Sequence, residues 1–167
     1  MCVLGWPERV AEALVRRGDL DVLVVDAQGE GSGLVRQLER RGVVATDVAV
    51  SGIGGAAASA RVVVLDAAAV GPASAVAVAG SRAAAAVAHH AGVPVWLVTG
   101  AGRLLPRRMF DCLAGRVEAA SEPWDSDDDV MPLDLVDALV GPSGPEPVAD
   151  GLRRTDCPVA PELLREI

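Results

Sequence analysis

The sequence predicts a three-layer α/β fold with a mainly parallel sheet. Short apolar runs rich in Val and Leu recur at residues 20–25, 44–48, 61–65 and 94–98. Continuous apolar strands of this kind are buried on both faces, as in parallel sheets that helices cover. Helical segments alternate with these runs, so we expect right-handed crossovers and a doubly wound sheet.

The expected helices are recognised by apolar residues spaced to form one buried stripe. The clearest of them cover residues 6–17, 32–41 and 81–91. Glycine often follows the end of a helix, and here the glycines that do so are Gly18, Gly42 and Gly92. Weaker patterns predict a turn or short helix at residues 52–59, a short helix at 133–139 and a docked terminal helix at 158–167.

The length of 167 residues fits a single domain, which we expect to span residues 1–167. Its core must be built from Val, Leu and Ala, because the aromatic residues are three Trp and one Phe. An acidic stretch at residues 125–129 and a Pro- and Gly-rich stretch at 141–147 predict a loop-rich segment over residues 121–150.

Charge and composition exclude several classes of protein. The net charge of -8 opposes binding to nucleic acid, which depends on Lys and Arg neutralising phosphates. The apolar runs are far shorter than the ~20 residues that cross a bilayer, and no secretory signal is readable, so we expect a cytoplasmic protein without membrane contact. The three Cys are far apart and form no zinc-binding pattern, and we expect no metal or cofactor.

Candidate site residues lie where predicted strands end, because ligands of open α/β sheets bind at the carboxyl ends of the strands. Asp26 and Asp66 each follow a strand, and they are the carboxylates that we nominate as catalytic acid or base. Neither has an obvious partner in sequence.

Glycine-rich and basic segments at the same ends could bind phosphate. Gly29, Glu30, Gly31, Ser32 and Gly33 join a strand to a helix, where backbone amides could cradle an anion. The alternative is a turn that lets helix and strand pack closely.

Arg103, followed by Arg107 and Arg108, could pair with an anionic ligand, or these side chains could be solvated or paired with the acidic stretch at 125–129. His89 and His90 fit a structural role in the last turn of a helix.

The order of these segments resembles the C-terminal domain of the initiation factor 2B family. Relatives have a Val-rich strand that leads into Glu/Asp-Ser/Thr-Arg-Pro and then Glu/Gln-Gly, and here Val24-Val-Asp-Ala-Gln28 leads to Glu30-Gly31. A later strand, an Ala-rich helix and "Val-Pro-Phe-Tyr-Val" correspond to residues 62–66, 84–90 and 93–98. The family includes regulatory subunits of a translation initiation factor and ribose-phosphate isomerases, and the resemblance implies a Rossmann-like fold.

The departures from the family pattern concern its polar residues. The acid that moves a proton in the isomerases falls at Ala68, the family's Asn-Lys pair at Ala77 and Val78, and its Arg at Gln28. The resemblance therefore implies a degenerate member without isomerase activity, which works as a binding or assembly domain. The alternative is an aldose-ketose isomerase of sugar phosphates whose acid or base has moved to Asp66 or Asp26.

The expected ligand is a phosphorylated sugar or a nucleotide. Residues expected to bind it combine the positions that match the family with the candidate anion-binding groups: Gln28, Gly29, Glu30, Gly31, Ser32, Gly80, Ser81 and Arg103. Because relatives pair through this domain, the resemblance also implies a homodimer.

Overall fold

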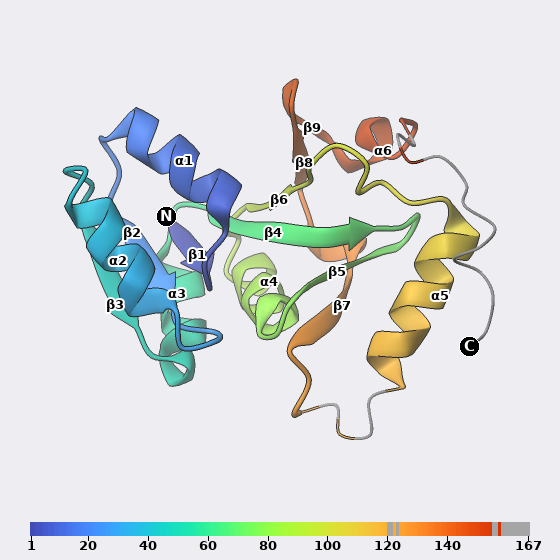
Figure 1. The fold of residues 1–167 in the computed structure, drawn as a ribbon, viewed down its shortest axis with the longest axis horizontal. Coiled ribbons are helices and arrows are strands. Elements are labelled where there is room, and N and C mark those ends of the chain that lie inside the picture. Colours follow the sequence, from blue (N-terminus) through green and yellow to red (C-terminus); the bar gives the residue numbers. More distant parts are fainter. Residues whose placement is uncertain (120–121, 123, 155–156, 158–167) are drawn as a thin grey trace.

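The computed structural model describes residues 1–119, 122, 124–154 and 157. Its strands are β1 (Cys2–Leu4), β2 (Val22–Val25), β3 (Ala45–Val48), β4 (Val63–Val70), β5 (Ser74–Val78), β6 (Val95–Val98), β7 (Asp128–Pro132), β8 (Ala138–Gly141) and β9 (Gly144–Pro147). Its helices are α1 (Glu8–Arg17), α2 (Gly31–Glu39), α3 (Ile53–Ser59), α4 (Ser81–His90), α5 (Arg107–Glu118) and α6 (Val148–Gly151), with 3-10 turns η1 (Val50–Gly52) and η2 (Leu133–Leu135). In Figure 1, β4 crosses the middle of the molecule between α1–α3 and α5.

The sheet is mainly parallel. Its strands follow the order β3-β2-β1-β4-β6-β8-β9, in which every pair is parallel except the last. From β1 the chain first adds β2 and β3 on one side of the sheet and then adds β4, β6 and β8 on the other side, so the direction of winding reverses between β1 and β4. Because loops diverge at such a point, the carboxyl ends of β1, β2 and β4 border a crevice.

Strand β4 belongs to two kinds of pairing. Its first half runs parallel to β1 and β6, and its second half pairs antiparallel with β5, which in turn pairs antiparallel with β7. The register shifts between Ala67 and Ala69, so Ala68 sits at a bulge. A bulge bends a strand and re-aims its side chains, and this one lies at the edge where the crevice opens.

Helices cover both faces of the parallel sheet. One buried cluster joins α1 and α2 to the sheet and includes Val10, Leu34 and Leu38. A second joins α3 and α4 to the opposite face through small side chains such as Ala57 and Ala84. The three-layer α/β fold with a mainly parallel sheet is thereby confirmed, as is a core of Val, Leu and Ala.

Several elements differ from the sequence prediction. The helix expected at residues 133–139 is wrong: after the turn η2 the chain enters β8, because that segment completes the parallel sheet beside β6. Strands β7, β8 and β9 lie in the segment expected to be rich in loops, and β1, β5 and α5 were not predicted. The strand expected to end at Leu65 continues to Val70. The expected terminal helix at 158–167 lies outside the described residues.

Among the described residues, no helix has the length and apolar character that a bilayer crossing requires.

Candidate functional site

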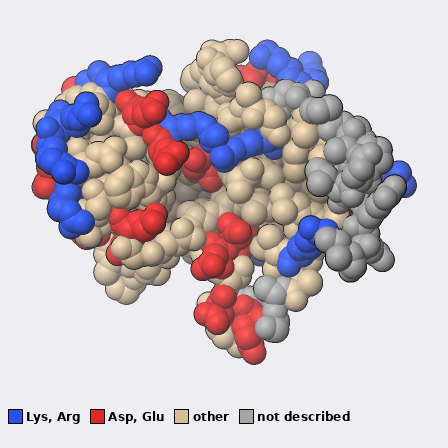
Figure 2. All heavy atoms as spheres, in the orientation of Figure 1, with Lys and Arg blue, Asp and Glu red and all other residues tan. Residues whose placement is uncertain are grey.

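A polar pocket of about 210 Å³ opens at the carboxyl ends of β1 and β2, beside the point in β4 where its parallel pairing ends. It is lined by Leu4, Gly5, Trp6, Pro7, Gln28, Glu30, Asp66, Ala68, Val78, Arg103 and Asp128. Figure 2 shows acidic side chains gathered near the middle of the molecule, next to a band of Arg side chains. Four residues nominated from the sequence therefore come together here: Gln28, Glu30, Asp66 and Arg103.

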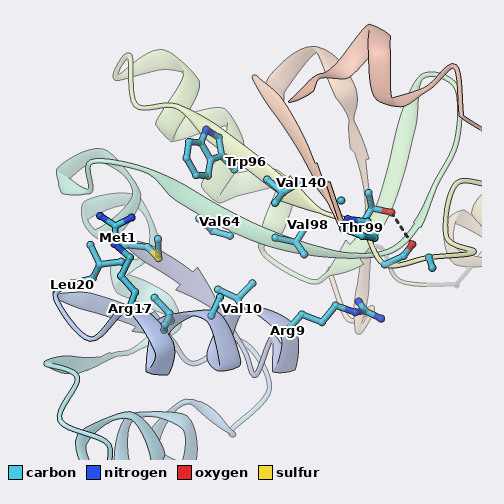
Figure 3. Close-up of a pocket in the computed structure, with 16 residues that line it drawn as sticks. Met1, Arg9, Val10, Arg17, Leu20, Val64, Trp96, Val98, Thr99 and Val140 are labelled. Carbon is cyan, nitrogen blue, oxygen red and sulfur yellow. Dashed lines mark hydrogen bonds between the residues drawn. The ribbon is translucent and has the colours of Figure 1, made fainter. Parts of the chain in front are cut away.

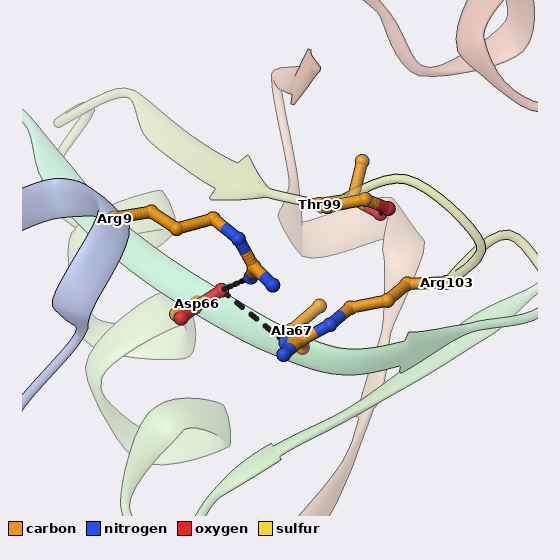
Figure 4. Close-up of polar contacts among 6 residues, drawn as sticks. Arg9, Asp66, Ala67, Thr99 and Arg103 are labelled. Carbon is orange, nitrogen blue, oxygen red and sulfur yellow. Dashed lines mark hydrogen bonds and ion pairs between the residues drawn. The ribbon is translucent and has the colours of Figure 1, made fainter. Parts of the chain in front are cut away.

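Asp66 is the centre of an ion cluster in this pocket (Figure 4). Its Oδ1 atom lies 3.3 Å from Nη1 of Arg9, which donates a hydrogen bond to it, and 3.6 Å from Nη1 of Arg103. Arg103 also donates to the backbone carbonyl of Ala67. The Asp66 side chain is 22% exposed, against 43% for Arg9. Two guanidinium groups thus hold one carboxylate at the end of the parallel part of β4.

The electrostatics of Asp66 reflect two opposing effects. Burial raises the pKa of the Asp66 carboxyl above its usual value, and nearby Glu8 adds to this rise, whereas Arg103 and Arg9 lower the pKa. The pKa is raised although both guanidinium groups lower it, so desolvation is the stronger effect. A partly desolvated carboxyl of this kind can accept or share protons from a bound ligand.

Arg9 was not singled out by the sequence, although it belongs to the cluster. It lies in the first turn of α1 and reaches over the end of the sheet. A Cβ atom at Gly100 would lie 2.6 Å from Cζ of Arg9, so the guanidinium packs directly against the Gly100 backbone. The absence of a side chain at Gly100 leaves the space that Arg9 occupies.

The glycine-rich loop before α2 is built around Asp26. The Asp26 carboxylate accepts a hydrogen bond of 2.9 Å from the backbone N–H of Gly31, the first residue of the helix. A Cβ atom at Gly31 would lie 2.9 Å from Cβ of Asp26, and one at Gly33 would lie 2.7 Å from the Trp6 ring. Close packing thus accounts for both glycines, and Asp26 caps the helix.

The N-terminus of α4 is capped by a carboxylate from another part of the chain. Oδ2 of Asp129, in β7, accepts hydrogen bonds from the backbone N–H groups of Gly80 and Arg82 at 2.9 and 3.0 Å. The hydroxyl of Ser81 is buried and has no hydrogen-bond partner among the described residues. The Gly80 amide, which was expected to bind phosphate, therefore donates to a carboxylate that belongs to the protein, as does the neighbouring Arg82 amide.

Replacing Asp129 with Ala should lower the free energy of unfolding by about 1 kcal/mol, the usual cost of losing a helix cap. Chemical denaturation of the two proteins measures this difference. Asp134→Ala serves as the matched control, because Asp134 is an exposed acid for which the structure gives no hydrogen bond or ion pair. An Asp129→Ala protein as stable as the parent would show that the carboxylate contributes nothing to α4.

Asp128 is a second acid in the pocket that the sequence did not identify. It begins β7, and burial raises the pKa of its carboxyl, helped by the neighbouring charges of Asp127 and Asp129. Ala68 lines the same pocket with a methyl group. The pocket thus contains two candidate acids, Asp66 and Asp128, whose carboxyl pKa values are raised.

The remaining nominated residues lie around the pocket without lining it. Ser32 accepts a hydrogen bond from Arg36 within α2. Gly29 has a φ of +78°, which a turn requires and which glycine adopts readily. Arg107 and Arg108 are exposed in the first turn of α5, so Arg103 alone of these three arginines reaches the pocket. No group of three potential metal ligands occurs among the described residues.

A larger apolar cleft of about 460 Å³ lies on the other side of Arg9, between α1 and the strands β6 and β8 (Figure 3). Val10 of the helix faces Val64 and Val140 of the sheet across it, and Leu14 and Trp96 also line the cleft. Trp96 is 37% exposed, and no helix among the described residues covers this part of the sheet face. Parallel sheets normally have both faces covered.

No protein-family model matches the sequence, and no match was found among curated proteins. Solved structures do match the fold. The eIF2B beta structure from Chaetomium thermophilum superposes with a TM-score of 0.74 at 21% identity, over 95% of this chain and 48% of the other. An eIF-2B translation initiation factor from Pyrococcus horikoshii OT3 gives 0.72 at 15% identity, over 90% and 59% of the two chains.

A third similar structure is subunit delta of eIF-2B from A. fulgidus, with a TM-score of 0.65 at 17% identity over 98% of this chain and 56% of that one. At these identities the likeness shows a shared fold, and it is the fold that the sequence resemblance implied. The chain spans about half the length of the solved chains that it matches.

Proposed function

We propose that this chain is a degenerate member of the initiation factor 2B family, a cytoplasmic homodimer that binds a small polar ligand without isomerase activity. The observation that carries the proposal is the lining of the polar pocket. The pocket is present at the carboxyl ends of the strands, but Ala68 stands where the family's acid is expected. A methyl group cannot move a proton, so the pocket retains a place for a ligand and lacks the acid of the reaction.

The size of the pocket favours a ligand no larger than a sugar. Its volume of about 210 Å³ lies below the roughly 300–1,000 Å³ of sites for drug-sized molecules. A nucleotide, one of the two ligand classes that the sequence suggests, is too large for this space. Gln28, Glu30, Asp66 and Arg103 supply polar groups around a sugar-sized space.

Purified protein should not convert ribose-1,5-bisphosphate or methylthioribose-1-phosphate to the corresponding ketose. Product formation followed by chromatography or ¹³C NMR measures this directly. The matched control is Ala68→Asp, which returns an acid to the family's position and lines the same pocket. Conversion by the unmodified protein, abolished by Asp66→Asn, would overturn the proposal.

A second candidate function is an isomerase with a relocated acid, and one observation favours it. Asp66 and Asp128 line the same pocket from different strands, and burial raises the pKa of both carboxyl groups. Asp66 and Ala68 also share that pocket, as expected for residues two apart on a strand. The conversion assay above, with the Asp66→Asn variant, separates this candidate from the first.

The apolar cleft supports assembly with a second copy of the chain. Trp96 and Val140 line a part of the sheet face that no helix of the described chain covers, and a second copy would bury them. Helix α1 beside the cleft carries both Glu12 and Arg16, so two copies related by a twofold axis could pair opposite charges across the contact.

Trp96→Asp should weaken this homodimer by at least about 2 kcal/mol, or roughly thirtyfold in Kd, because buried Trp residues often dominate interfaces. Sedimentation equilibrium at micromolar concentration measures the change. Trp124→Asp is the control, since Trp124 is 85% exposed and does not line the cleft. A chain that is monomeric before any substitution would exclude the homodimer.

A further inference from the structure

We propose that the polar pocket prefers a small hydroxylated ligand with a positive charge, an amino sugar or amino alcohol, and that it disfavours phosphate esters. This inference rests on the proposed function and names the ligand class of the same pocket. It follows from the positions of the protein's own carboxylates. Two carboxylates, Asp26 and Asp129, accept hydrogen bonds from backbone amides that a phosphate would need. Three others line the cavity.

The first amide site is the N-terminus of α2. Its Gly31 N–H donates to Asp26, which is fixed on the preceding strand and held there by close packing. A phosphate could bind this amide only by displacing a carboxylate that the fold already positions. A positioned group of this kind acts at a high effective concentration, so a free anion at millimolar concentration competes poorly with it.

The second amide site is the N-terminus of α4, where Asp129 accepts two backbone hydrogen bonds. Asp129 is held in β7, which pairs along its whole length with β5. Both sites that the sequence suggests for phosphate, at Gly31 and at Gly80, are therefore satisfied from within the chain. The positive ends of both helix dipoles are likewise offset by acidic side chains.

The cavity itself carries an excess of negative charge. Glu30, Asp66 and Asp128 line it together with Arg103, and Arg9 contacts Asp66 from beside the lining, which gives three formal negative charges against two positive. Both guanidinium groups lie against Asp66, so Glu30 and Asp128 have no ion pair with a described residue. The Arg103 guanidinium is already engaged by Asp66 and by the Ala67 carbonyl. At Asp128 the charges of Asp127 and Asp129 add to burial in raising the pKa of the carboxyl, so this end of the cavity disfavours a further negative charge. A phosphate dianion would add to this repulsion.

A hydroxylated amine matches each of these features. Carboxylates accept hydrogen bonds from hydroxyl groups, and charge-assisted hydrogen bonds to an ammonium group are the strongest that they make. The ammonium group would also offset the excess charge among Glu30, Asp66 and Asp128. Complementary charge favours this class of ligand and rejects its anionic relatives.

Three probes with the same ring test the charge preference: glucosamine, glucose and glucose 6-phosphate. Calorimetric titration of the full chain should give binding at least about tenfold tighter for glucosamine than for glucose 6-phosphate, with glucose between them. Equal or tighter binding of glucose 6-phosphate would overturn the preference and leave the ligand-binding function standing. No binding of any probe would overturn both.

Substitutions that each remove one carboxylate test whether the preference for a positively charged ligand arises in this pocket. Asp128→Asn and Glu30→Gln each remove one negative charge from the pocket and should reduce the ratio of glucosamine to glucose 6-phosphate affinity at least about threefold. Glu30 is exposed, so its variant should fold normally, and thermal unfolding checks both proteins. Glu39→Gln is the control, because Glu39 is exposed on α2 and does not line the pocket. An unchanged ratio in both pocket variants would overturn the proposal.

Discussion

Gly71→Ala should destabilise the protein by about 1–3 kcal/mol, the usual range when a methyl group is forced into a packed core. A Cβ atom at Gly71 would lie 2.3 Å from two ring carbons of Phe110, which is 2% exposed. Gly71 does not have a positive φ, so alanine fits the backbone there and the clash is the cause of the loss. Phe110 must shift, and it joins α5 to Ala69 and Val76 of the β4–β5 hairpin.

The control lies in the same helix. Gly115 is exposed in α5, and a Cβ atom there would meet nothing within 4 Å. Gly115→Ala should therefore stabilise the protein by about 0.5–1 kcal/mol, because alanine favours helices more than glycine does. Urea denaturation of both variants gives the two changes. Equal stability of the Gly71→Ala protein and the parent would show that α5 packs loosely on the hairpin.

The alternation of strands and helices could be predicted because its signals are local. Residues of β2, such as Val22 and Val24, form an apolar run, and α2 shows its buried stripe at Leu34 and Leu38 within one short segment. Each pattern indicates whether one or two faces of the helix or strand are buried, whichever element packs against them. The parallel sheet follows from those runs and from the handedness of crossovers.

Very short elements, and residues whose contacts lie far away in the sequence, could not be predicted in this way. Strand β1 is three residues long, which is too short for a periodic pattern. Strand β7 opens with Asp128 and Asp129, which indicate a solvated loop when read alone. The contact that explains Asp129 joins it to Gly80, 49 positions away. Only the three-dimensional pairing of β5 with β7 brings those residues together.

Helix α5 is different, because its signal was present in the sequence. Its apolar residues recur at the spacing of a helix with one buried face: Met109, Phe110, Leu113, Ala114 and Val117. Arginines at the start and Gly115 in the middle made this stripe less evident than the others. Counting the matches to a helical template over residues 107–118 would have identified it.

The site could be predicted in part. Asp66 and Arg103 follow the ends of strands predicted from the sequence, so the general location of ligand sites in α/β sheets was enough to nominate them, although β4 continues past Asp66 to Val70. Arg9 could not be found, because its contact with Asp66 depends on how α1 crosses the end of β4. Asp128 was hidden for a similar reason, since it reaches the pocket through the antiparallel pairing of β7 with β5.

Arg103→Met should lower the free energy of unfolding at neutral pH by about 1–2 kcal/mol. Hydrogen bonds to charged groups contribute roughly 1.5–3 kcal/mol, and solvent reduces this because the Arg103 side chain is 33% exposed. Methionine keeps most of the aliphatic stem, so the change removes the charge and the hydrogen bond to Ala67 and leaves the packing similar. Arg103 is the largest influence that lowers the pKa of Asp66, so the variant should show a further rise in that pKa by ¹³C NMR.

The loss should depend on pH, and its sign follows from the raised pKa of Asp66. The folded protein holds the Asp66 proton more tightly than the unfolded chain, so stability falls as the pH rises from the unfolded pKa through the folded one. Removing Arg103 raises the folded pKa further and enlarges this fall. The charge-dependent part of the loss should therefore be absent below the pKa of Asp66 in the unfolded chain and complete only above its raised pKa in the folded protein.

Arg9→Met is the matched comparison, and it should cost less than Arg103→Met although the Arg9 contact is shorter. Arg9 is 43% exposed, and exposed ion pairs contribute about 0–1 kcal/mol because water screens them. Denaturation curves of both variants, recorded across the acidic to neutral range, separate the two arginines. If the Arg103→Met loss were the same at every pH, the guanidinium would act on the fold through the Ala67 hydrogen bond alone, and the charge pairing with Asp66 would be refuted.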